Sequence, residues 1–101
     1  MKMLLIVFHQ SIAEHIHALL KEYDINAFSE LQNVAGRGET GPNTQFLLSP
    51  GANRMIFTAV SEKAAYRLTE GLTRFKTEQE ASQRDTPCHV HVFAIACEQT
   101  L

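Results

Sequence analysis

The sequence predicts an α+β fold in which two helices cover one face of a four-stranded antiparallel sheet. Short apolar runs alternate with segments whose apolar residues recur every three or four positions, and these two patterns mark strands and helices respectively. Their order along the chain is strand, helix, strand, strand, helix, strand. Of the 101 residues, 45% are hydrophobic and 20% are charged, which is the size and balance of one globular domain over residues 1–101.

The N-terminal segment predicts a strand followed by a helix. Residues 3–8 form an unbroken apolar run, as expected of a strand covered on both faces. Ser11-Ile12-Ala13-Glu14 has the pattern of a capping box, in which the Ser11 hydroxyl and the Glu14 carboxylate satisfy the first free amides of a helix. The helix is expected to end near Asp24. Its apolar stripe recurs at helical spacing and comprises Ile12, Ile16, Leu19, Leu20 and Tyr23.

The middle of the chain predicts two strands separated by a long connection. Residues 25–34 are read as the second strand, and residues 36–43 as a loop, because three glycines and a proline defeat regular structure there. A short apolar patch at 46–48 is followed by a second break at 49–51. Residues 55–60 form the third strand. Long loops between strands are more often functional than not, so the 36–43 loop is a candidate contact for an effector or a partner.

The C-terminal third predicts a helix, a linker and a final strand. Ser61 is placed to cap the helix, whose apolar residues again recur at spacings of three and four. These apolar residues are Ala65, Leu68, Leu72 and Phe75. Residues 78–87 are polar throughout and are expected to form an exposed linker. Residues 89–97 form the last strand.

Right-handed crossovers between these elements give the strand order 4-1-3-2 with both helices on one face, which is the ferredoxin-like βαββαβ sandwich. The other face of the sheet is then left bare. The first strand is nevertheless apolar at both parities, with Leu4, Ile6 and Phe8 on one side and Met3, Leu5 and Val7 on the other. The last strand repeats this pattern. Because proteins seldom expose so large an apolar patch, we expect the bare face to be buried against other copies of the chain.

Three short motifs carry a resemblance to a known family. They are Phe28-Ser29-Glu30-Leu31-x-x-Val34-x-Gly36-x-Gly38, Gly36-Arg37-Gly38-Glu39, and Pro50-Gly51-Ala52-Asn53. With the order of elements, they resemble P-II-type signalling proteins, and more closely the divergent P-II-like proteins with a shortened loop. The resemblance implies a cytoplasmic, non-enzymatic homotrimer that binds a small effector in clefts between subunits and controls a partner such as a membrane transporter. The family is associated with nitrogen regulation, and its divergent group with cation transport.

The candidate effector-binding set comprises Gly36, Arg37, Gly38 and Glu39, which belong to the loop that the resemblance identifies, together with Arg54. Arg54 is placed to reach an anion at a subunit cleft, and a solvated arginine is the alternative at that position. The sequence departs from the usual pattern, since Ala35 and Glu39 replace the Lys and Arg that flank the glycine pair, and no tyrosine lies in the loop. Residues 79–87 contain no glycine, so the second phosphate-binding loop has no counterpart. Conventional sensing of ATP and 2-oxoglutarate is therefore not expected. A nucleotide, another small anion and a divalent transition metal ion stay open as effectors.

The histidines offer an alternative function. His89 and His91 are two apart on a predicted strand and can share a face, and the predicted sheet brings the start of that strand beside His9. Three neutral imidazoles suit Zn²⁺, Cu²⁺, Ni²⁺ or Co²⁺, so His9, His89 and His91 form a candidate metal site. Histidines at a strand entrance are also common without a metal. His15 and His17 lie on different faces of the first helix and are expected in solvent.

Charge and cysteine content exclude some classes of function. The net charge of −2 and the scattered basic residues argue against binding to nucleic acid. Cys88 and Cys97 lie roughly 30 Å apart on one strand, too far for a disulfide, which fits a reducing compartment. No nucleophile with an orienting base and acid is evident. A small enzyme of ferredoxin-like fold, such as a monooxygenase or an isomerase, remains a third class.

Overall fold

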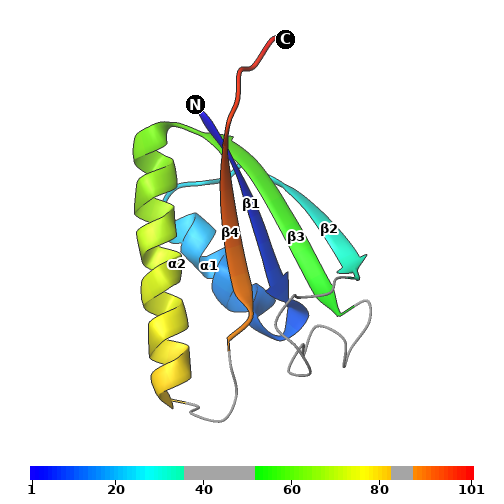
Figure 1. Cartoon of the computed structure of the whole chain (residues 1–101), viewed down its shortest axis with the longest axis vertical. Coiled ribbons are helices and arrows are strands. Elements are labelled where there is room, and N and C mark those ends of the chain that lie inside the picture. Colours follow the sequence, from blue (N-terminus) through cyan, green and yellow to red (C-terminus); the bar gives the residue numbers. More distant parts are fainter. Residues whose placement is uncertain (36–51, 83–87) are drawn as a thin grey trace.

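The computed structural model describes residues 1–35, 52–82 and 88–101. Its elements are β1 (Lys2–His9), η1 (Gln10–Ile12), α1 (Ala13–Glu22), β2 (Ser29–Val34), β3 (Asn53–Val60), α2 (Glu62–Ser82) and β4 (Val90–Ala96). The sheet order is β2-β3-β1-β4, with every neighbouring pair antiparallel, and both helices lie on the same face (Figure 1). This is the predicted order read from the opposite edge, so the α+β ferredoxin-like fold class is confirmed.

The core lies between the sheet and the helices. Even-numbered residues of β1 point into it, and Leu4, Ile6 and Phe8 are fully buried. They pack with apolar residues of both helices, including Ile16 of α1 and Leu68 of α2. The helical stripes and the strand alternation therefore meet on one side of the sheet, as the two periodicities predicted.

The opposite face of the sheet is apolar and exposed in the single chain. Phe93 and Ile95 of β4 are 58% and 53% exposed, and Leu31 of β2 is 51% exposed. Between these edges, the odd-numbered residues of β1 and Met55 and Phe57 of β3 are only half-buried. We call this surface the open face, and define it by Met3, Leu5, Val7, Leu31, Met55, Phe57, Phe93 and Ile95. The predicted bare apolar face is therefore present.

The start of the first helix differs from the prediction. The N-cap of α1 is Ile12, which makes no capping hydrogen bond through its side chain. Residues Gln10–Ile12 form a short 3-10 turn instead, and the Nδ1 atom of His9 accepts a hydrogen bond from the Ser11 amide at 3.1 Å. The Ser11 hydroxyl is also bonded to that nitrogen, at 2.8 Å. The capping-box prediction was therefore wrong, because Ser11 lies within the 3-10 turn and the His9 ring accepts the Ser11 amide that the Glu14 carboxylate would take in the box.

The second helix begins as predicted but ends later. The Ser61 hydroxyl accepts a hydrogen bond from the Ala64 amide at 3.1 Å, which confirms the N-cap. The helix then continues to Ser82, so residues 78–82 of the predicted linker are helical. These residues contain no glycine or proline, and Glu, Gln and Ala are good helix formers, so polarity alone was a poor reason to end the helix there.

The second strand is shorter than predicted, because Asp24 adopts a left-handed conformation (φ 59°) and the next four residues are not in the sheet. The predicted 36–43 loop and the 46–48 patch lie outside the described residues. Cys88 and Cys97, on either side of β4, are both free thiols. Neither of the described helices is long and apolar enough to cross a membrane.

Candidate functional site

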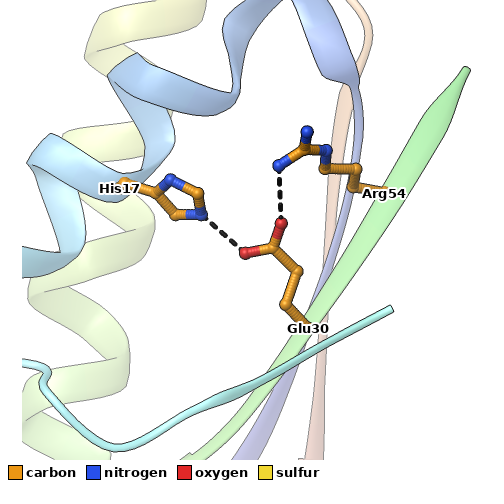
Figure 2. A network of polar contacts seen from close by, with 3 residues as sticks. All are labelled: His17, Glu30 and Arg54. Atoms are coloured by element: carbon orange, nitrogen blue, oxygen red, sulfur yellow. Dashed lines mark hydrogen bonds and ion pairs between the residues drawn. The ribbon is translucent and has the colours of Figure 1, made fainter. Parts of the chain in front are cut away.

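Three polar side chains from three different elements meet at one carboxylate. The Nε2 atom of His17, on α1, lies 2.6 Å from Oε1 of Glu30, on β2. The Nη1 atom of Arg54, on β3, donates to Oε2 of Glu30 at 2.9 Å. Figure 2 shows the imidazole and the guanidinium on separate sides of the carboxylate, each facing one oxygen. We call these three residues the Glu30 network.

The strand register explains why these side chains converge. Glu30 pairs with the buried Ile56 across β2 and β3, so Glu30 lies on the face of the sheet that the helices cover. Arg54 is two residues before Ile56 on the same strand and therefore lies on the same face. His17 follows the buried Ile16 on α1, and its ring stacks on Phe28 with centroids 6.1 Å apart.

The network keeps Glu30 charged although its side chain is only 15% exposed. Burial by itself raises the pKa of a carboxyl group. The hydrogen bonds and positive charges that His17 and Arg54 provide outweigh this effect, so the pKa of Glu30 lies below its ordinary value. Breaking either contact would leave a largely buried charge with fewer partners.

Arg54 is the only member of the predicted effector-binding set that lies within the described residues; Gly36, Arg37, Gly38 and Glu39 lie outside them. The Arg54 side chain is 26% exposed and is paired with Glu30. The expectation that His17 points into solvent was wrong, since it contacts Glu30. No sequence signal identified this contact, because it depends on the position of α1 relative to β2, which the packing of the whole fold sets.

The candidate metal residues lie at the end of the sheet where β1 and β4 meet. The His9 amide donates to the His89 carbonyl at 3.3 Å, which confirms that the two chain segments are adjacent. Burial, with the nearby positive charges of Lys76 and, for His89, of His91, lowers the pKa of both His89 and His91. Within 1–35, 52–82 and 88–101, no group of three His, Cys, Asp or Glu side chains is placed to hold a metal ion.

The tautomer of His9 follows from its contacts. Because Nδ1 accepts the Ser11 amide, this nitrogen carries no proton in the neutral ring, and Nε2 is the protonated one. A metal bound at Nε2 would require the opposite tautomer and the loss of the Ser11 amide bond. Metal binding at either ring nitrogen of His9 would therefore break the hydrogen bond from the Ser11 amide.

A buried amide lies beside His9. Asn53 is the Cα partner of His9 on β1 and is 1% exposed. Neither its Oδ1 nor its Nδ2 atom has a hydrogen-bond partner among the described parts of the chain. An unpaired buried polar group costs about 1–3 kcal/mol. This end of the sheet, where the 36–51 segment joins β3, therefore contains a polar group that needs a partner.

Comparison with known proteins supports the fold. No protein-family model and no curated protein matches the sequence. Among solved structures, CPII, a nitrogen regulatory PII-like protein from Thiomonas intermedia K12 bound to ADP, AMP and bicarbonate, is 23% identical to this chain. The match covers 99% of this chain and 94% of that one, with a TM-score of 0.64.

Two further structures match over most of their length. A structure of CPII bound to ADP and bicarbonate is 26% identical and covers 93% of this chain and 84% of that one, with a TM-score of 0.62. A protein from Thermus thermophilus, described as PII-like, is 17% identical and covers 93% and 82%, with a TM-score of 0.54. The chain therefore has the P-II-like ferredoxin-type fold, and the resemblance that its motifs predicted is confirmed.

Proposed function

We propose that this protein is a non-enzymatic P-II-like regulator that assembles as a homotrimer and binds a small effector in the clefts between subunits. One observation carries the proposal: the P-II-like fold presents an apolar open face. Burial of apolar surface is the main driving force of association. Other copies of the chain, placed against the open face, would remove Phe93, Ile95 and Leu31 from water.

The effector that we propose is an adenine nucleotide, acting alone or with a small anion. CPII structures of this fold contain ADP, AMP and bicarbonate. In this chain Gly36, Arg37, Gly38, Glu39 and Arg54 would form the binding set.

Binding would act through the 36–43 loop. A ligand shifts a conformational equilibrium only by its difference in affinity for the two states. We therefore propose that the occupied cleft favours one arrangement of the loop. This arrangement would then bind or release a membrane transporter from its cytoplasmic side. Regulation of nitrogen metabolism and of cation transport are the processes that the family resemblance suggests.

Titration calorimetry with ADP and AMP, together with light scattering, tests the proposal. We expect three copies per particle and binding of ADP in the absence of any turnover. Arg37→Ala should weaken ADP binding by about ten- to a hundredfold, the equivalent of one hydrogen bond between charged groups. Arg74→Ala, on the exposed side of α2, is the matched control and should leave the affinity unchanged. A monomer that binds neither nucleotide would contradict the proposal.

A metal-binding or metal-tolerance function is the second candidate, because β1 and β4 bring the backbones of His9 and His89 together. Titration of Zn²⁺, Cu²⁺ and Ni²⁺ against the wild type and the His89→Ala, His91→Ala double variant tests it. Binding that is tight in the wild type and lost in the double variant would support a metal site. Equal, weak binding in both proteins would remove this candidate.

A further inference from the structure

The Glu30 network has the form of a receptor for a carboxylate. Two side chains that are distant in sequence, His17 and Arg54, each approach one oxygen of the same planar group. They are positioned by α1 and β3, both of which belong to the packed part of the fold. The carboxylate itself comes from β2, which is an edge strand of the sheet.

The contact between Arg54 and Glu30 uses only one amino group of the arginine side chain. A guanidinium has five N–H donors, and the strong pairing with a carboxylate uses two of them in parallel. Here Nη1 alone bonds to Glu30, and the other amino group points away from it (Figure 2). The Arg54 and His17 side chains are 26% and 39% exposed, so both remain partly open to solvent with Glu30 in place.

We propose that His17 and Arg54 form a binding site for a small planar anion with two oxygens, a carboxylate or bicarbonate, and that Glu30 is an internal occupant which this anion displaces. The inference rests on the proposed function, for which it identifies the chemistry of the anionic effector. The exchange conserves charge, because one anion replaces another beside the Arg54 guanidinium. It also has a structural consequence, since displacement of Glu30 breaks the side-chain contacts from β2 to His17 of α1 and to Arg54 of β3, while the backbone pairing of β2 with β3 remains.

The Glu30 network joins the two strands that flank the 36–51 segment in the chain. Residue 34 is the last of β2 and residue 53 is the first of β3, so the two strands that the network joins lead into and out of the 36–51 segment. Glu30 and Arg54 are four and one residues from these points, respectively. An anion that exchanged with Glu30 would therefore remove one side-chain contact between the two strands that flank this segment.

Removal of the internal occupant provides the test. Glu30→Ala leaves His17 and Arg54 in place without a competing carboxylate. Thermal unfolding of the full chain is followed while sodium acetate or sodium bicarbonate is added, with sodium chloride at equal ionic strength as the salt control. We expect both anions to raise the Tm of Glu30→Ala above the chloride control, with an apparent affinity at least about tenfold higher than for the wild type. Glu98→Ala, which removes an exposed carboxylate, should behave like the wild type.

Two further variants make the result decisive. Glu30→Gln keeps the shape of the side chain without its charge, and serves if Glu30→Ala does not fold; it should also bind the anions more tightly than the wild type. Adding Arg54→Gln to either variant should abolish the response. No gain over chloride in both Glu30 variants, or a gain that persists without Arg54, would overturn the inference. An anion response in a monomer that ignores ADP would instead contradict the proposed function and leave the anion site standing.

Discussion

At the scale of single residues, the main feature of the protein is an ionised carboxylate, Glu30, in a mostly buried position. Burial disfavours the charged form of Glu30, but His17 and Arg54 stabilise that form by more, so this mostly buried carboxylate is ionised. The same three residues join α1, β2 and β3. A largely buried group of this kind contributes to stability only while all of its partners remain, so it is both a structural contact and a place where a ligand or a proton can act.

The lowered pKa of Glu30 predicts a pH dependence. A folded-state pKa below the unfolded value contributes stability that is present above the unfolded value and is lost as the pH falls through the folded one. At pH 7, Glu30→Gln should reduce the free energy of unfolding by about 1–3 kcal/mol. The deficit relative to the wild type should shrink as the pH falls below 4.5, the ordinary value for this group. This difference in the free energy of unfolding is measured by urea unfolding of both proteins at one protein concentration, at a series of pH values from neutral to acidic. A deficit that stays constant with pH would contradict this account.

At the scale of elements, a glycine sets how closely the two helices approach. Gly71 of α2 lies against the ring of Tyr23, the C-cap residue of α1, and a Cβ atom at this position would come within 2.5 Å of the Tyr23 Cε2 atom. The ring is held from another side by Arg67, whose guanidinium carbon lies 5.7 Å from the ring centroid. The absence of a side chain at Gly71 therefore makes room for the aromatic ring between the helices.

This contact predicts a change of sign in a double-mutant experiment. Gly71→Ala should reduce stability by about 1–2 kcal/mol, because overpacking against Tyr23 outweighs the gain in helix propensity. In a Tyr23→Ala background the obstacle is gone, and the same substitution should stabilise the protein by up to about 1 kcal/mol. Chemical unfolding of the four proteins gives both values. The explanation fails if Gly71→Ala has the same effect in the two backgrounds.

At the scale of the whole molecule, the sheet is apolar on both faces while the helices cover only one. The core face is closed by α1 and α2, and the open face has no cover within the described residues. Surfaces of this kind usually mark an interface. The proposed trimer would therefore contribute to the stability of the fold as well as to the formation of clefts between subunits.

A charge on the open face should separate the subunits. Phe93→Glu places a carboxylate where the proposed trimer would exclude water, and an unpaired buried charge costs several kcal/mol. We expect a monomer with a reduced Tm by light scattering and thermal unfolding. Tyr66→Glu is the matched control, because Tyr66 is an aromatic residue of α2 that is 66% exposed and lies outside the open face, so this variant should remain a trimer. A trimeric Phe93→Glu protein would show that the open face is not the interface.

The elements of this fold could be predicted from the sequence because their signals are local. The alternation of Leu4, Ile6 and Phe8 with their apolar neighbours predicted a strand with two apolar faces, and the Ser61 cap predicted where α2 begins. Local signals failed where a neighbour outside the segment decides the outcome. The His9 ring accepts the Ser11 amide that a capping box would use, and helix propensity extends α2 through residues 78–82, which were predicted to belong to a linker.

By itself, the sequence determined the order of strands and helices, the open apolar face and the motifs that point to a P-II-like fold, because each of these depends on the spacing of residues that are near one another in the chain. Only the tertiary structure decided that His17, Glu30 and Arg54 meet, since 13 and 24 residues separate the members of its two contacts. The register between β2 and β3 and the position of α1 above them create that meeting. Both are set by packing across the whole core, which no local pattern encodes.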